Sequence, residues 1–356
     1  MYCPLFGIHS SELKKYIKEA ISIQDTNIVD TTKPAAPVVE VEELSTIFKS
    51  DVAFKKAFES LTPGRQRGYL IFFSAAKQPA FEGDKSFEDG AAAAIDIDKD
   101  GDLDLIVTTG GNEYPNQPAK YPIRIYLNDG MGNFQVSKYS GRFFTSANTI
   151  AVSDMDKDGT AEIFVGGRVI PGHYGRIPQI FLFTVKGDSL QELPVSTAIA
   201  SAGMVTSATW ADFNNDGHQD LFVANRLSPN RLWWADGNGG FVDGSTTSGL
   251  WVSNARSYGA CAGDYDRDGD LDLYVLIDVI DEYPALFRPK VSDGSYPNTD
   301  RLYRCDWSKD LKHPVYTNVS KEAGITMEGF GLGLAICDIN QDNWPDIYVT
   351  NDYVSD

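Results

Sequence analysis

The nine residues Asp264-Tyr265-Asp266-Arg267-Asp268-Gly269-Asp270-Leu271-Asp272 are the clearest copy of the repeat on which this chain is built. It has carboxylates at positions 1, 3, 5 and 9 and glycine at position 6. In a tight cation loop alternate side chains point inward, the glycine permits the sharp turn, and the carbonyl of position 7 adds one more oxygen. Because all these ligands are oxygens and no Cys or His joins them, the loop favours Ca²⁺ over zinc.

The same pattern recurs in one phase, giving loops 1 to 5 in chain order. The candidate metal ligands, with position 7 included for its carbonyl, are Asp96, Asp98, Asp100, Asp102 and Asp104 in loop 1, Asp154, Asp156, Asp158, Thr160 and Glu162 in loop 2, Asp212, Asn214, Asp216, His218 and Asp220 in loop 3, Asp264, Asp266, Asp268, Asp270 and Asp272 in loop 4, and Asp338, Asn340, Asp342, Trp344 and Asp346 in loop 5. Position 6 of loop 5 is Asn343, and Asn tolerates left-handed backbone better than most residues. We expect loops 2 and 5 to bind Ca²⁺ more weakly than loops 1 and 4.

Two other interpretations of the loops are solvated turns and EF-hand sites. Short Asp/Gly clusters are common solvated turns, but five copies in one register make coincidence a poor explanation. An EF-hand needs Glu at position 12 and helical flanks. Here position 12 is valine in every loop and the flanks are strand-like, which argues against an EF-hand. The first residues of successive loops lie 58, 58, 52 and 74 positions apart, so the repeat is far longer than the loop itself.

The composition concentrates negative charge in these loops. The chain has 356 residues and a formal net charge of -19, and the five loops contain 20 carboxylates. No basic stripe is present, so nucleic acid is not expected as a partner. The four cysteines show no CxxC pairing. No apolar stretch is long enough for a membrane span, and the first residues lack the basic start and apolar core of a signal peptide.

Residues 1–80 predict a helical segment with a polar, proline-bearing linker at 24–40. Helical patterns cover 13–21, 42–48, 53–61 and 65–77. The stretches 57–69 (AFESLTPGRQRGY) and 74–78 (SAAKQ) resemble the YdeI/OmpD-associated family of small bacterial proteins. Where that family continues into an Arg-rich helix, the segment 79–83 (PAFEG) intervenes. We expect a helical appendage without a site of its own.

Residues 81–356 predict a β domain of repeated four-stranded units. In the first unit the strands are expected at 91–95, 103–108, 123–127 and 134–137. A period of 50 to 75 residues with about four strands argues for propeller blades. The loops, together with 229–233 (PNRLW), 298–303 (NTDRLY) and 319–325 (VSKEAGI), resemble the FG-GAP/VCBS repeat family and its ASPIC/UnbV-associated group. The resemblance implies an integrin-α-like Ca²⁺-binding β-propeller, usually exported and used for adhesion or recognition. Five blades are visible, the last one incomplete, and we expect an open propeller.

In a four-stranded meander, connections between second and third strands emerge opposite the metal loops. These connections, at 110–121, 166–178, 225–230 and 277–298, are the expected recognition face for a protein or glycan partner. The candidate ligand-face residues are Glu113, Tyr114, Arg168, His173, Tyr174, Arg176, Tyr283, Phe287 and Tyr296. The alternatives are a polysaccharide lyase or hydrolase, for which 172–176 (GHYGR) is the one suggestive cluster, and a purely structural module. The propeller resemblance indicates an extracellular, cell-surface or periplasmic location. The sequence leaves the oligomeric state open.

Overall fold

The computed structural model describes residues 49, 55, 56, 87–194, 199–251, 256–278, 291–326 and 328–351. The chain divides into two compact units, Met1–Ser86 with Leu127–Gln135, and Phe87–Tyr126 with Val136–Asp356. Most of the helical segment expected in residues 1–80, including the linker, lies outside the described residues; Lys49, Lys55 and Lys56 are helical. In the first unit the described turn is closed by Asp129, whose carboxylate accepts the backbone N–H groups of Met131 and Asn133 at 2.9 and 3.1 Å.

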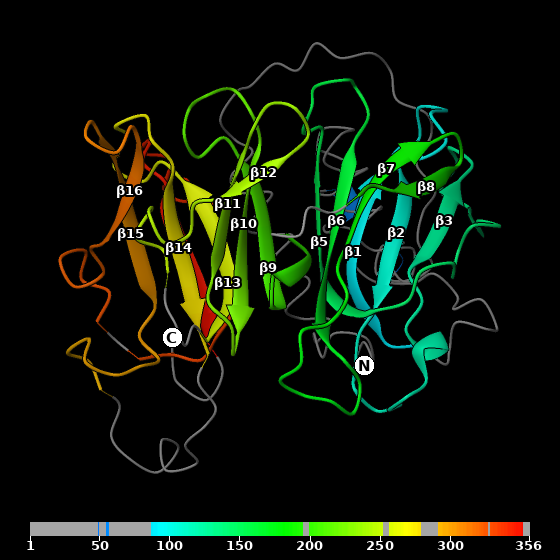
Figure 1. Ribbon diagram of the computed structural model, residues 1–356, viewed down its shortest axis with the longest axis horizontal. Coiled ribbons are helices and arrows are strands. Elements are labelled where there is room, and N and C mark those ends of the chain that lie inside the picture. The colour runs from blue at the N-terminus through cyan, green and yellow to red at the C-terminus, as the bar shows by residue number, and fades with distance from the viewer. Residues whose placement is uncertain are drawn as a thin grey trace. The chain divides into compact units, whose positions relative to one another are not determined.

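The second unit carries the blades (Figure 1), apart from the hairpin 127–135 of blade 1, which is counted with the first unit; each complete blade is a meander of four strands. Blade 1 contains β1 (Asp89–Ile95), β2 (Asp104–Thr109), β3 (Arg124–Asn128) and β4 (Phe134–Val136); blade 2 contains β5 (Ser146–Ser153), β6 (Glu162–Val169), β7 (Phe181–Lys186) and β8 (Ser189–Glu192); blade 3 contains β9 (Met204–Ala211), β10 (Asp220–Arg226), β11 (Arg231–Ala235) and β12 (Phe241–Asp243); blade 4 contains β13 (Ser257–Gly263), β14 (Asp272–Ile277), β15 (Arg301–Ser308) and β16 (His313–Asn318); blade 5 contains β17 (Gly331–Cys337) and β18 (Asp346–Asn351). Two short 3₁₀ turns, Pro118–Lys120 and Ile199–Ser201, lie between strands. The predicted four-strand unit is therefore confirmed.

The blades follow one another through their first strands. β1 lies beside β5, β5 beside β9, β9 beside β13 and β13 beside β17. Blades 1 and 2 are also joined into one sheet, because β2 pairs in parallel with β5 at Thr109 and Ser146. Between blades 3 and 4 the Thr206 hydroxyl contacts the carbonyl oxygens of Ala224 (3.1 Å) and Ser257 (2.9 Å). This succession of meanders confirms the mainly-β propeller predicted from the sequence.

The core lies between successive blades and is centred on the second strands of blades 1 to 4, whereas β18 of blade 5 is half-buried. These strands are buried on both faces, since each is flanked within its blade and covered by the neighbouring blades. Phe164 and Trp233 are fully buried between blades 2 and 3, and Phe222 packs with Leu273 between blades 3 and 4. At Gly166 a Cβ would lie 2.4 Å from Val205, so only glycine permits this approach of β6 to β9. The tight packing holds each first-to-second-strand loop in a fixed place.

Candidate metal centre

Every loop of the repeat connects the first strand of its blade to the second, and all five are held by the same hydrogen bonds. In loop 4, Asp264 Oδ2 accepts the backbone N–H of Gly269 at 3.1 Å, Asp268 Oδ1 accepts that of Asp270 at 3.0 Å, and Asp272 Oδ2 accepts that of Tyr265 at 3.0 Å. The equivalent bonds recur in loops 1, 2, 3 and 5 at 2.6–3.1 Å. The repeat seen in the sequence is thus a repeat of conformation.

Two positions in each loop have a left-handed backbone. At position 6 the glycines have φ between 83° and 97°, and Asn343 replaces them at φ 68° in loop 5, as its residue type allows. Position 4 is also left-handed, which the sequence did not indicate: φ is 64° at Lys99, 61° at Lys157, 56° at Asn215, 62° at Arg267 and 63° at Gln341. Left-handed backbone at a non-glycine residue costs energy, so the surrounding loop must impose it. It turns the side chain of position 4 away from the loop's own ligands.

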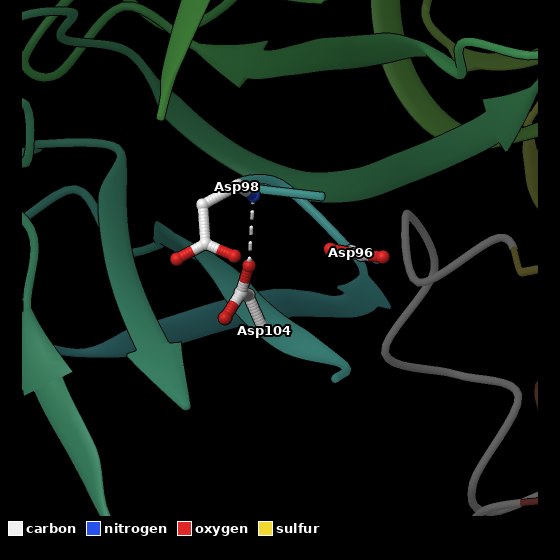
Figure 2. A group of neighbouring side chains, drawn as sticks. All are labelled: Asp96, Asp98 and Asp104. Atoms are coloured by element: carbon white, nitrogen blue, oxygen red, sulfur yellow. Dashed lines mark hydrogen bonds between the residues drawn. The ribbon is translucent and has the colours of Figure 1, made fainter. Parts of the chain in front are cut away.

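Carboxylate oxygens converge at positions 1, 3 and 9 in three of the loops. The groups Asp96/Asp98/Asp104, Asp154/Asp156/Glu162 and Asp264/Asp266/Asp272 each place one oxygen per residue within 4.8 Å of the others. Figure 2 shows the loop 1 group, in which the Asp98 backbone N–H also contacts Asp104 Oδ2 at 3.4 Å.

Several oxygens of these three groups are buried without a hydrogen-bond partner. They are Oδ1 of Asp96, Asp98, Asp154 and Asp266. A buried carboxylate oxygen without a donor is costly, and a bound divalent cation would satisfy it. The residues present therefore fit a hard cation with oxygen ligands.

Loops 3 and 5 have an amide at position 3 instead of a carboxylate. Asn214 accepts the backbone N–H of Asp216 at 2.9 Å and donates its Nδ2 to Asp216 Oδ2 at 3.0 Å. Asn340 and Asp342 are arranged identically, at 2.9 and 3.0 Å. The amide pairs with position 5 and lowers the negative charge of these two loops, so they are weaker attractors for a cation than loops 1 and 4.

The position 9 carboxylates anchor the loops to the blades. Asp104, Glu162, Asp220 and Asp272 are at most 3% exposed. Besides the bond within its loop, Asp220 Oδ1 accepts the N–H of Ala235 at 2.8 Å and Asp272 Oδ1 accepts that of Cys305 at 2.8 Å. Burial is the main cause that raises the pKa of Asp220 to about 7 and that of Asp272 to about 6; nearby carboxylates add to it, and these backbone N–H bonds oppose it.

The carboxylates at position 3 lie close to other carboxylates of the same loop. The pKa of Asp98 is raised by burial and by Asp104 and Asp100, and that of Asp266 by burial and by Asp268 and Asp264. Each shift means that the ionised carboxylate is disfavoured where it stands. A divalent cation between these groups would reverse the sign of the interaction.

Two of the four expected recognition connections meet. The second of them begins after β6, at 170 and not at 166, so Arg168 lies on a strand and not in a connection as predicted from the sequence. The Gly172 N–H donates to Asn112 Oδ1 at 2.8 Å, so the 110–121 and 166–178 connections touch. Tyr174 is 55% exposed and Tyr114 is 40% exposed, with Lys120 Nζ 5.2 Å from the Tyr114 ring centre. Of the remaining candidates, His173 and Arg176 are exposed, Glu113 accepts the N–H of Asn112 at 2.8 Å, Tyr296 is half-buried, and Tyr283 and Phe287 lie outside the described residues.

Arg168 is placed differently from the other candidates. Its guanidinium carbon lies 5.9 Å from the ring centre of Tyr258, so a side chain of blade 2 reaches the first strand of blade 4. The Asn148 amide, oriented to satisfy its hydrogen bonds, accepts from Arg168 Nη1 at 3.1 Å and donates to Ala147 O at 3.0 Å. Within the described part of the chain, Arg168 forms no ion pair with a carboxylate. Sequence reasoning missed Tyr258 and Asn148, because strand residues carried no signal for this contact.

Comparison with known proteins gives two family matches and several distant structures. Residues 96–165 and 212–275 match the FG-GAP-like repeat model, and residues 38–80 match the model described as bacteriocin-protection, YdeI or OmpD-associated. The uncharacterized protein YdeI of Bacillus subtilis (strain 168) is 48% identical over 67 residues, which are 18% of this chain and 34% of that protein. The matched segment thus spans about a third of the curated relative's length.

Three solved structures align with this chain at low similarity. The V. cholerae biofilm matrix protein Bap1 aligns with a TM-score of 0.38 and 17% identity over 74% of this chain and 35% of its own. MPT-1, a GDP-Man-dependent mannosyltransferase from Leishmania mexicana, aligns at 0.34 and 10% over 75% and 82%, and a glycoside hydrolase at 0.37 and 11% over 75% and 87%. TM-scores this low support no conclusion about what this chain does. The chain carries FG-GAP-like repeats at residues 96–165 and 212–275, preceded by a YdeI or OmpD-associated segment at residues 38–80.

Proposed function

We propose that this chain is a calcium-binding β-propeller module that recognises a protein or glycan partner on the face opposite its calcium loops, without catalysis of its own. The observation that carries the proposal is the set of buried, unpartnered carboxylate oxygens that converge in loops 1, 2 and 4. The shared hydrogen-bond frame extends the proposal to loops 3 and 5.

Calcium suits these loops better than the other common metals. The side-chain ligands are carboxylates and amides, joined by the position 7 carbonyl, and Ca²⁺ prefers such oxygen sets with flexible geometry. His218, at position 7 of loop 3, would contribute its carbonyl and not its ring. Five bound Ca²⁺ ions would change the net charge from -19 to roughly -9. Calcium would therefore remove much of the repulsion that the loops create.

Calorimetric titration of the chelator-treated protein tests the calcium part. We expect saturable heat with up to five ions per chain and a smaller response to Mg²⁺, which demands stricter octahedral geometry. A triple variant, Asp98→Ala/Asp156→Ala/Asp266→Ala, should lose three ions. Asp310→Ala is the control for the loss of a single carboxylate, because this exposed side chain lies in the β15–β16 turn and outside the five loops. Absence of calcium heat in the unmodified chain would end the proposal.

The recognition part rests on the joined 110–121 and 166–178 connections and on Arg168. Exposed tyrosines on a rigid scaffold supply contact area at a small cost in conformational entropy. Arg168 adds a cation that is already oriented by Tyr258 and Asn148 and can still donate hydrogen bonds. These features suit a partner that presents an acidic group beside an apolar surface.

A glycan array and a panel of purified matrix proteins, probed with the whole chain in calcium, test this part. Arg168→Ala should abolish binding of acidic ligands, and Tyr174→Ala should weaken it about tenfold or more, as expected for an interface anchor. Val242→Ala serves as the control, because Val242 is an exposed apolar residue on β12 of blade 3. If all variants bind as the unmodified chain does, the partner binds to another surface than the 110–121 and 166–178 connections.

The same purified chain distinguishes the two alternatives, a polysaccharide lyase or hydrolase and a purely structural module. The His173 ring forms no hydrogen bond or ion pair with another described residue, so the 172–176 cluster shows no assembled acid–base pair. Product release from acidic polysaccharides would nevertheless reveal a lyase or hydrolase. Calcium binding without any ligand would indicate a purely structural module.

We also propose that the chain works outside the cytosol. Extracellular calcium modules have dissociation constants on the order of 10⁻⁴–10⁻³ M, at which cytosolic calcium would leave the loops largely empty. No helix among the described residues is long and apolar enough to cross a membrane. Detection of the tagged chain in the medium, at the cell surface or in the periplasm tests this location.

A further inference from the structure

The side chain at position 4 of each loop reaches the next loop in the chain. Lys99 of loop 1 donates its Nζ to Thr160 Oγ1 of loop 2 at 3.2 Å. Asn215 of loop 3 donates its Nδ2 to Asp270 Oδ1 of loop 4 at 2.8 Å. Thr160 and Asp270 both occupy position 7 of their loops.

The remaining two pairs of neighbouring loops show the same direction. The Arg267 guanidinium of loop 4 lies 5.1 Å from the ring centre of Trp344, at position 7 of loop 5. Lys157 Nζ of loop 2 lies 3.9 Å from the point where a Cβ on Gly217, at position 6 of loop 3, would stand. The chemistry differs in each pair. Position 4 lies at position 7 of the next loop in three pairs, and beside position 6 in the loop 2–loop 3 pair.

The left-handed backbone at position 4 explains this agreement. Position 4 has positive φ in all five loops, and at Lys99, Asn215 and Arg267 the end of the side chain lies at the next loop. Because the positive φ recurs at Lys99, Lys157, Arg267 and Gln341, residue types with no preference for it, the loop conformation imposes it. The contact between loops is thus a property of the repeat and not of one side chain.

Position 7 is where such a contact can act on metal binding. Its carbonyl is the expected backbone ligand, and its N–H fixes the carboxylate of position 5. In loop 4 the Asp270 N–H donates to Asp268 Oδ1 at 3.0 Å. Holding the Asp270 side chain therefore restrains two ligands of loop 4 together.

We infer that position 4 holds the positioning residues of the following loop, so that calcium binding at neighbouring loops is positively coupled. The inference rests on the proposed calcium binding. An ion in loop 3 orders the tip that carries Asn215, which leaves less disorder to be lost when loop 4 binds its ion. By linkage, loop 4 strengthens loop 3 by the same factor.

A charge-neutral variant tests this coupling. Asn215→Gly keeps the left-handed backbone accessible and removes the amide that contacts Asp270. The matched control is Gln341→Gly, at position 4 of loop 5, where φ is 63° against 56° at Asn215 and no further loop of the repeat is contacted among the described residues. Calcium affinities are read by calorimetry on the whole chain, so no activity assay is involved.

We expect Asn215→Gly to weaken two of the stepwise affinities and Gln341→Gly no more than one. The neighbouring-site effect should be about 2- to 10-fold, the range available to one hydrogen bond. Asp212→Ala, which removes a loop 3 ligand, should weaken a second site in the unmodified background but not in Asn215→Gly.

The outcomes separate the two proposals. Calcium binding in which Asn215→Gly alters a single affinity, as the control does, would overturn the coupling and leave the calcium proposal intact. Absence of calcium heat in every protein, including the unmodified chain, would overturn both.

Discussion

Replacing Asp266 with alanine is expected to change stability differently with and without calcium. Asp266 Oδ1 is buried and has no hydrogen-bond partner, and burial together with Asp268 and Asp264 raises the pKa of this carboxyl group. In chelator the carboxylate contributes repulsion, so its removal should leave the melting temperature unchanged or raise it. In calcium the same change removes a ligand of loop 4.

The magnitude in calcium follows from mass action. With a dissociation constant of about 10⁻⁴–10⁻³ M and calcium at about 10 mM, one bound ion stabilises the native state by about 1.4–2.7 kcal/mol. For a β domain of this size, that corresponds to roughly 2–5 °C in melting temperature. In chelator the same substitution should raise the melting temperature or leave it unchanged, and this difference distinguishes a metal ligand from a structural residue.

Thermal melts of the unmodified chain, Asp266→Ala and the control Asp310→Ala, each in calcium and in chelator, provide the measurement. The control should lie within about 0.5 kcal/mol of the unmodified chain under both conditions, as most surface substitutions do. If Asp266→Ala loses the same stability in chelator as in calcium, Asp266 has a structural role and the metal assignment of loop 4 is wrong.

Three further outcomes are expected. Asp266→Asn gives loop 4 the position 3 residue of loops 3 and 5, so calorimetry should show an affinity between those of the unmodified chain and Asp266→Ala. In chelator, the free energy of unfolding should fall as pH rises from about 4 to 7, because the pKa values of Asp220 (about 7) and Asp272 (about 6) exceed the unfolded value and the native state binds more protons in this window. Asp220 accounts for up to about 4 kcal/mol of this fall. Urea unfolding at several pH values measures the free energy, and its slope against pH should be shallower in calcium. Thr206→Val, which removes the hydroxyl between Ala224 and Ser257, should cost about 1 kcal/mol by the same method.

The sequence was sufficient for those features that depend on local spacing. Position 6 needed a residue that accepts left-handed backbone, and both the glycines and Asn343 meet that need. The flanking strands follow from the apolar runs around each loop, and β2 begins within one residue of its predicted start. These predictions succeeded because one loop and its two strands form a hairpin that is specified within a short stretch of chain.

Features that depend on how blades pack could not be predicted. Lys99, Lys157 and Arg267 have no preference for positive φ, so nothing in their residue type indicated the left-handed position 4. Arg168 and Tyr258 are far apart in sequence, and they meet only in the folded chain, where the guanidinium carbon lies 5.9 Å from the ring centre. The parallel pairing of Thr109 with Ser146 likewise depends on the angle between two blades.

The position 9 carboxylates of loops 3 and 4 bond both to their own loop and to the third strand of the blade, and this affects how the ions bind and dissociate. In loops 3 and 4 the second oxygen of Asp220 or Asp272 is fastened to the third strand of the blade, through Ala235 or Cys305. The alignment of the strands is therefore secured by the polypeptide itself before any ion arrives. Emptying a loop should loosen only its tip, and refilling should be a local event, much faster than refolding.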